Sequence, residues 1–267
     1  MNTKQNWLKR IGLGLLALLV GLVLVVAGLI GYDTVFGRDI TAVTNITYPG
    51  PDGQTLHGYL AQPDTPGPHP GVLLIHEWWG LNEEITALAD ELAGAGFVVL
   101  APDSYRGQTT SLIPRAIWLV TTTPQPQIAA DIDSALAYLH QLDTVDEARV
   151  GSVGFCFGGR QSLWLGLRQP DLLAATVLFY GGPETEIEAL RPLSQPVLGI
   201  FGRDDSSIPL TNVAAFEQSL QQLGITHTVT IYDDVGHAFL NSENIHVPGQ
   251  ARAAWEQMLD FLNTHLQ

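Results

Sequence analysis

The chain contains one cysteine, Cys156, whose surroundings are typical of a catalytic nucleophile. It lies in the run GFCFGG at residues 154–159, between a predicted strand at 149–154 and a predicted helix at 159–168. A G-x-C-x-G run in this context matches a nucleophile elbow with Cys in place of Ser, where small neighbours permit a sharp backbone turn. The helix N-terminus that follows favours a thiolate and offers backbone N–H groups to an oxyanion. The alternative is a structural cysteine buried in a glycine-rich turn.

An acid and a histidine follow two predicted strands farther along the chain. Asp205 comes after the strand predicted at 196–201, and His237 comes after the strand predicted at 227–232. Because parallel strands end at the same edge of a sheet, we expect these side chains to meet the cysteine. The order nucleophile, acid, histidine is that of a catalytic triad. Asp204 is the alternative acid, and a turn-forming Asp beside a structural His is the alternative interpretation of the pair.

Composition argues against several other chemistries. The 267 residues include 12 Lys+Arg and 27 Asp+Glu, a net charge of −15, and both lysines lie within the first ten residues. Residues 31–267, called the body below, therefore lack the lysine that Schiff-base and P-loop chemistry require. An acidic body also disfavours nucleic acid as a partner. A single cysteine can form neither an intramolecular disulfide nor a thiolate-rich zinc site. The run HEWWG at 76–80 lacks the second histidine of HExxH, the zinc-binding motif of metalloproteases. We expect no metal and no cofactor.

The N-terminus carries a candidate membrane segment. Residues 11–30 are 20 consecutive uncharged and mostly apolar residues, and a basic tail at 1–10 precedes them. A helix of this length spans roughly 30 Å, the thickness of a bilayer core. We expect an uncleaved single-pass anchor with the tail in the cytoplasm and the body outside, because positive flanks stay inside. A cleaved signal peptide, which would release a secreted protein, is the alternative.

After a linker at residues 31–40, residues 41–267 are predicted to form one α/β domain. Residues 42–48 and 55–61 predict a β-hairpin, after which strand-type and helix-type segments alternate. The further strands are predicted at 71–76, 97–101, 149–154, 174–180, 196–201 and 227–232, and the helices at 84–93, 128–142, 159–168, 210–223 and 250–265. This alternation predicts a mostly parallel twisted sheet with helices on both faces and the hairpin at one edge.

The chain resembles the dienelactone hydrolases (carboxymethylenebutenolidases) of the α/β-hydrolase superfamily over residues 41–266. The resemblance rests on four motifs: HEWWGL at 76–81, APDSYR at 101–106, GFCFGG at 154–159 and GHAF at 236–239. The family pattern G-x-x-D-x-x-[IV]-P, counted from Gly202, selects Asp205 over Asp204. The resemblance implies an α/β-hydrolase fold and hydrolysis of a small ester or lactone through an acyl-enzyme thioester, with Cys156, Asp205 and His237 as the triad.

The resemblance implies roles for three residues beside the triad. Glu77 matches the glutamate that pairs with the resting cysteine in this family, and the backbone N–H groups of Trp78 and Phe157 match its oxyanion hole. A carboxylate in that place can take the thiol proton when substrate displaces the resting contact, so that thiolate forms only when needed. An exposed loop carboxylate is the alternative interpretation of Glu77.

Substrate-binding residues depart from the family pattern. Two family arginines hold a substrate carboxylate; the first position falls at Gly107, directly after Arg106, and the second falls at Asn241. We expect Arg106 and Asn241 near the substrate, and a neutral or cationic ester rather than a carboxylated one, because a bidentate ion pair is lost. Aromatic residues near strand ends are expected to line an apolar pocket, with core packing as the alternative; they are Trp79, Tyr105, Tyr180 and Phe239.

The sequence leaves two other functions and the oligomeric state open. One alternative is a catalytically idle α/β-hydrolase-fold protein that binds a ligand on the outer membrane face. The other is an acyl transferase or a peptidase on the same triad, since a triad alone does not choose the acceptor. The expected partners are a small ester or lactone and, through residues 11–30, a lipid bilayer.

Overall fold

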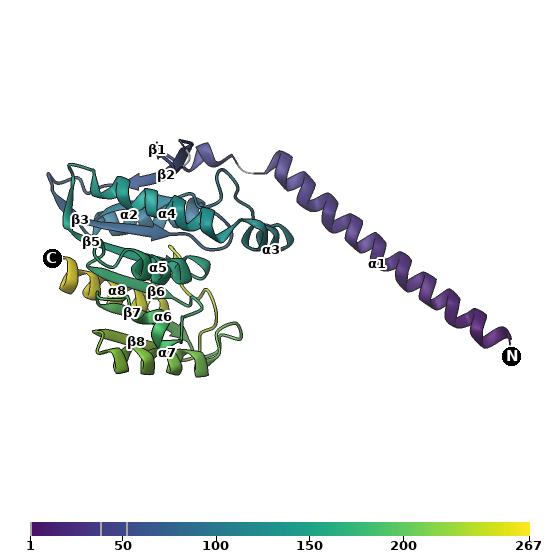
Figure 1. Cartoon of the computed structure of the whole chain (residues 1–267). Helices are drawn as coiled ribbons and strands as arrows, with labels where there is room; N and C mark the ends of the chain where they lie inside the picture. Colours follow the sequence, from purple (N-terminus) through teal and green to yellow (C-terminus); the bar gives the residue numbers. More distant parts are fainter. Residues whose placement is uncertain (1, 38, 52) are drawn as a thin grey trace.

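A computed structural model describes residues 2–37, 39–51 and 53–267. The first element, α1 (Asn2–Phe36), projects away from the body as a single long helix (Figure 1). Its segment Arg10–Val35 contains an 18-residue window with a mean hydropathy of 3.0 and is long enough to cross a membrane. The helix continues past residue 30 and the chain leaves it only near Gly37, so most of the expected linker at 31–40 is helical.

Eight strands form one sheet in the order β1-β2-β4-β3-β5-β6-β7-β8. The edge strands β1 (Ile46–Pro49) and β2 (Thr55–Ala61) are antiparallel to each other, and β2 is antiparallel to β4. The strands that follow are parallel to their neighbours. They are β3 (His69–Ile75), β4 (Val98–Pro102), β5 (Val145–Phe155), β6 (Ala175–Phe179), β7 (Val197–Gly202) and β8 (His227–Tyr232). A mostly parallel sheet with the hairpin at one edge is the arrangement that the sequence predicted.

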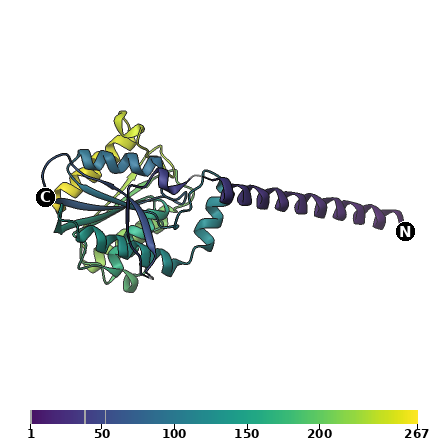
Figure 2. The same cartoon turned by 90° about the horizontal axis from the view of Figure 1, so that it is seen from above.

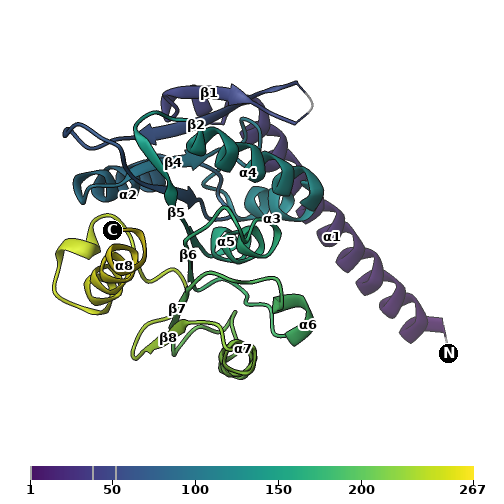
Figure 3. The same ribbon diagram turned by 60° about the vertical axis from the view of Figure 1, so that its left-hand side comes forward.

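Helices cover both faces of this sheet, which explains why the central strands contain runs of successive buried, mostly apolar residues. In β3, Val72 and Leu74 pack into the core on one face, whereas Leu73 and Ile75 pack into the core on the other. This alternation follows from the two-residue period of a strand. The helices α2 (Glu83–Gly94) and α8 (Gln250–Leu266) supply the first face, and α4 (Gln125–His140), α5 (Phe157–Arg168) and α7 (Leu210–Leu223) supply the second (Figures 2 and 3).

Two helices were not predicted from the sequence. The helix α3 (Ile113–Thr122) contacts α1, and α6 (Ile187–Leu190) is a single turn. In α3 a proline stands in the first turn and the run ends in β-branched residues, which hides a helix from pattern analysis. The chain also forms a 3₁₀ turn at Ile40–Ala42 before β1, where the sequence predicted the start of a strand.

Candidate active site

Cys156 lies at the sharp turn between β5 and α5. Its backbone has φ 55° and ψ −113°, a conformation that few non-glycine residues adopt. The turn requires its glycines: a Cβ on Gly154 would lie 2.0 Å from the Gly158 carbonyl oxygen, and a Cβ on Gly158 would lie 2.1 Å from the Ile75 carbonyl oxygen. The sequence run GFCFGG therefore folds as a strained elbow that presents the cysteine at the carboxyl end of β5.

His237 follows β8 and Asp205 follows β7, and the two side chains form a hydrogen bond. The distance from His237 Nδ1 to Asp205 Oδ2 is 2.7 Å. The other carboxylate oxygen, Oδ1, accepts hydrogen bonds from the backbone N–H groups of Ser207 at 2.7 Å and Ile208 at 3.2 Å. The Asp205 side chain is buried, whereas Asp204 is exposed. With Nδ1 donating to the carboxylate, Nε2 of a neutral His237 remains an acceptor.

A cavity of about 650 Å³ brings the cysteine and the histidine to one surface. Besides Cys156 and His237, its wall contains Glu77, Trp78, Trp79, Val120, Phe157, Arg160, Tyr180, Gly182, Pro183, Ser207, Ile208, Pro209, Asn212 and Ala238. These residues come from the loops at the carboxyl ends of β3, β5, β6, β7 and β8 and from α3, α5 and α7. The cavity therefore occupies the edge of the sheet where open α/β folds bind ligands.

The thiol is held in its protonated form. Burial, the nearby carboxylate of Glu77 and, to a lesser extent, Asp205 raise the pKa of Cys156 to about 12, although hydrogen bonds from the backbone N–H groups of Phe157 and Trp78 oppose this rise. Burial, together with the charge of Glu84, raises the pKa of Glu77 to about 7. The same two N–H groups that reach the sulfur are placed to receive an oxyanion formed next to it.

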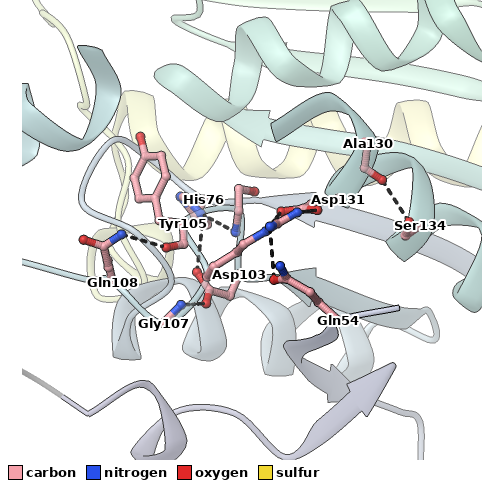
Figure 4. A network of polar contacts seen from close by, with 11 residues as sticks. Gln54, His76, Asp103, Tyr105, Gly107, Gln108, Ala130, Asp131 and Ser134 are labelled. Carbon is pink, nitrogen blue, oxygen red and sulfur yellow. Dashed lines mark hydrogen bonds and ion pairs between the residues drawn. The ribbon is translucent and has the colours of Figure 1, made fainter. Parts of the chain in front are cut away.

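A buried histidine fixes the loop that carries Glu77 and Trp78. The Nδ1 atom of His76 lies 2.5 Å from the Glu77 carbonyl oxygen, and its Nε2 atom accepts a hydrogen bond of 3.2 Å from the Ser104 N–H. Burial lowers the pKa of His76 to about 4, so the ring is neutral and donates through Nδ1. The neighbouring Asp103 accepts from the N–H groups of Tyr105 and Gly107 (Figure 4). This network holds the backbone from which the Trp78 N–H projects.

Of the expected pocket aromatics, Trp79 and Tyr180 line the cavity. The Tyr180 ring lies 5.3 Å from the His237 ring, measured between centroids. Tyr105 is buried behind the cavity, with its ring 5.1 Å from His76 and 5.5 Å from Phe157. Phe239 packs on Tyr180 at 5.5 Å. Tyr105 and Phe239 therefore support the cavity wall instead of forming it.

Arg106 and Asn241 do not fit the expectation that they bind substrate. The Arg106 guanidinium pairs with Asp131 of α4, with Nε 2.7 Å from Oδ2 and Nη2 2.8 Å from Oδ1, and also donates to Gln54 (Figure 4). The Asn241 Oδ1 atom accepts from the backbone N–H groups of Glu243 and Asn244. Both side chains thus bind their own chain, and neither belongs to the cavity wall.

Arg160 is the charged residue of the cavity wall that was not predicted from the sequence. It stands in the first turn of α5, and its guanidinium carbon lies 4.9 Å from the centroid of the Trp164 ring, one turn farther along the helix. Its place directly after GFCFGG was the available signal, because the first turn after an elbow faces the same cavity as the nucleophile. Within residues 2–37, 39–51 and 53–267, no group of three His, Cys, Asp or Glu side chains is placed to hold a metal ion.

Comparison with known proteins decides the family. The sequence profile of the Dienelactone hydrolase family matches residues 56–266. The chain belongs to the dienelactone hydrolase family. It is a hydrolase with an α/β-hydrolase fold, which confirms the family, fold and enzyme class expected from the four motifs. The helix α1 lies outside the matched residues.

The matches with this chain span nearly the whole length of these relatives. Over 224 residues the chain is 32% identical to "Protein usf" of Aquifex pyrophilus, spanning 80% of this chain and 96% of that protein. Over 225 residues it is 30% identical to a "Putative carboxymethylenebutenolidase" of Aquifex aeolicus, spanning 81% and 96%. A solved structure of a "Putative Dienelactone Hydrolase" from Klebsiella pneumoniae superposes with a TM-score of 0.72 at 29% identity, spanning 82% of this chain and 97% of that one.

Proposed function

We propose that this hydrolase cleaves carboxylic esters or lactones with Cys156 as its nucleophile, through an acyl-enzyme thioester. The observation that carries the proposal is the shared cavity wall of Cys156 and His237, with Asp205 bonded to the far side of the histidine ring. A nucleophile, a general base and a group that orients the base are the three parts that acyl transfer needs. A small ester or lactone is a substrate class that suits a cavity of about 650 Å³.

The proposed acylation begins with a proton transfer. Substrate entering the cavity displaces the resting contact, Glu77 takes the thiol proton, and the thiolate attacks the substrate carbonyl carbon. The N–H groups of Trp78 and Phe157 stabilise the resulting oxyanion. When the C–O bond to the alcohol breaks, the proton held by Glu77 passes to the departing oxygen. Acylation therefore leaves a Cys156 thioester, a carboxylate at Glu77 and a free alcohol.

Deacylation uses water and His237. The Nε2 atom removes a proton from a water molecule, which attacks the thioester carbonyl carbon, while Asp205 stabilises the imidazolium. The C–S bond breaks, the carboxylic acid is released, and the thiolate recovers its proton from His237. In a lactone the alcohol and the acid belong to one product molecule.

The two adjacent acids after β7 provide a matched test. We expect Cys156→Ala and Asp205→Asn to lower turnover of a small activated ester by roughly 10³-fold or more, because triad members act as a unit. Asp204→Asn is the control; its side chain is exposed and should leave turnover unchanged. Circular dichroism checks that each variant is folded. Unchanged turnover in a folded Cys156→Ala variant would overturn the proposal, whereas a parent protein that turns over no small ester would favour the idle binding protein.

We further propose that α1 anchors the hydrolase in a membrane with its basic N-terminal tail in the cytoplasm and its body outside. The support is the apolar segment Arg10–Val35 and the positive charge that precedes it.

A further inference from the structure

The helix α3 presents a row of apolar side chains to solvent. Ile113, Ile117 and Trp118 are 58%, 48% and 50% exposed, and their spacing of four and five residues places them on one side of the helix. The side that faces the body is buried through Arg115, Ala116 and Leu119. The exposed row, called the α3 stripe below, combines two isoleucines with a tryptophan, the residue type that favours a membrane–water interface.

The α3 stripe lies beside the outer end of the membrane segment. α3 contacts α1, and Figures 1 and 2 place it next to the C-terminal end of that helix. Among the residues of α1 whose burial the structure describes, Val26, Ile30 and Asp33 are half-buried, and their spacing of four and three defines one face. Val26 and Ile30 belong to the segment predicted to cross the lipid core. A helix packed at their level lies at the boundary between the lipid and water.

A short connection keeps the body in that position. α1 ends at Phe36, whereas Ile40 is already buried in the core of the body. Four residue steps of extended chain span at most roughly 14 Å. The surface of the body around Ile40 therefore stays close to the membrane, whatever tilt the anchor adopts.

The charge distribution favours the same contact. Residues 31–267 hold all 27 Asp and Glu of the chain, yet the segment 104–130, which contains α3, has none and includes two arginines. An acidic face would be repelled by anionic headgroups, whereas this segment is not. The segment that carries the α3 stripe and contacts α1 therefore has no carboxylate of its own that anionic headgroups would repel.

We propose that α3 lies in the headgroup layer of the membrane that α1 crosses, with the α3 stripe in contact with lipid. Amphipathic helices bind membranes in this way, by burying an apolar face at the boundary between headgroups and acyl chains. Lipid is the occupant because the anchor already holds the helix at that depth. Val120 of the same helix lines the cavity of Cys156, so the cavity opens beside the bilayer. Given the proposed function, the substrate class is then an apolar ester that partitions into lipid.

The single cysteine permits a direct test that does not depend on catalysis. In a Cys156→Ser background, Ile117→Cys is labelled with a fluorophore sensitive to polarity, and the full chain is reconstituted into phospholipid nanodiscs. We expect blue-shifted emission that nitroxide-bearing lipids quench and aqueous iodide does not. Leu172→Cys is the matched control, because Leu172 is a similarly exposed apolar residue, at 42%, before β6. Its label should be quenched by iodide and not by the lipid nitroxide.

The outcomes separate lipid from other occupants. Quenching of the Ile117 label by iodide, as for the control, would overturn the proposal. Protection from both quenchers would mean that a protein surface covers the stripe, which also overturns it. A label at Ile113→Cys, one turn earlier, gives a second reading if the first labelled variant folds poorly.

Kinetics test the substrate class separately. Changing all three stripe residues to Ser should remove any preference of the nanodisc-bound enzyme for a long-chain over a short-chain neutral ester, with turnover of the short-chain ester unchanged. A preference that survives this change would overturn the substrate class. Unchanged turnover of both esters in the Cys156→Ala variant would overturn the proposed function alone, and the label result stands without it.

Discussion

At the scale of single residues, opposing effects act on the thiol of Cys156. Burial and the charge of Glu77 raise its pKa to about 12, and the hydrogen bonds from Phe157 and Trp78 compensate only in part. A thiol in this state is a poor nucleophile at neutral pH, so the proposed mechanism needs a base that acts when substrate binds. Glu77, with a pKa raised to about 7, is matched to that task.

Replacing Glu77 should separate activity from stability. Its pKa is about 7 in the folded protein against the ordinary value of 4.5, so the folded state binds the proton more tightly and loses stability as the pH rises between these values. Glu77→Gln removes this loss: we expect the variant to be more stable than the parent at pH 8, by up to about 3 kcal/mol, and equally stable at pH 4. Ester turnover should fall. Thermal unfolding at both pH values measures the effect.

An exposed glutamate on β5 serves as the control for this prediction. Glu147→Gln should leave turnover and the melting temperature close to those of the parent, because the side chain is exposed. A Glu77→Gln variant that is no more stable than the parent at pH 8 would contradict the burial argument.

Arg160 allows a test of substrate charge. The sequence favoured a neutral or cationic ester, yet the cavity wall contains this arginine. An exposed ion pair contributes up to about 1 kcal/mol, so Arg160→Gln should lower kcat/KM for an ester with a carboxylate in its acyl group by up to about fivefold. A neutral ester should be unaffected. Arg168→Gln, on the same helix but paired with Asp133, is the control. An equal fall for both esters would mean that Arg160 shapes the cavity without reading charge.

The residues of the candidate site could be predicted where a reactive side chain stands in a short sequence run that follows a predicted strand. Cys156, Asp205 and His237 each follow a strand within a few residues, and the structure brings all three to one edge of the sheet. Arg106 was misplaced because its partner Asp131 is 25 residues away on α4, and pairing at that distance leaves no sequence pattern. The position of a long charged side chain is therefore hard to predict from the sequence when its partner lies in a distant segment of the same chain.

At the scale of elements, two close backbone approaches build the elbow. The turn after β5 passes so near to β3 that only hydrogen fits on the α-carbon of Gly158. The strands themselves were predictable as apolar runs, because helices cover both faces of the sheet. The helix α3 could not be predicted from its apolar residues, because its apolar stripe faces away from the body and the side that packs on the body is short.

The elbow glycine should tolerate no side chain. Gly158→Ala places a methyl group 2.1 Å from the Ile75 carbonyl oxygen, and we expect a loss of stability of about 3 kcal/mol or more. Gly94→Ala, at the end of α2 with nothing within 4 Å of the new methyl group, should instead stabilise by roughly 0.5–1 kcal/mol. Thermal unfolding of the two variants compares them directly. Similar melting temperatures would contradict the packing described at the elbow.

At the scale of the whole molecule, the chain joins an apolar helix to an acidic body. Residues 31–267 carry 9 Lys+Arg after the three of the N-terminal tail are subtracted from 12, and 27 Asp+Glu, a net charge of −18. The basic tail and the acidic body thus flank the apolar part of α1 with opposite charge. This distribution of charge can be counted from the sequence, because it does not depend on side-chain packing.

The orientation of the anchor can be tested in cells that express the full chain. We expect protease added outside spheroplasts to digest the body, because the positive flank retains the N-terminus inside. The protein should also stay with the membrane after a high-salt wash, since an apolar helix is not displaced by ions. A cytoplasmic marker enzyme that resists the protease is the control. Release of a shortened chain into the medium would instead identify residues 1–30 as a cleaved signal peptide.

The strand order also determines how the molecule bears mechanical load. The chain passes from α1 through Ile40–Ala42 into β1, a four-residue strand at the edge of the sheet, paired with β2. Tension between the anchor and a body held elsewhere acts first on this short antiparallel ladder. The strands that end at the cavity lie behind it, toward the middle and the opposite edge. A pull on α1 would therefore reach the β1–β2 pairing before it reaches the strands that end at the cavity.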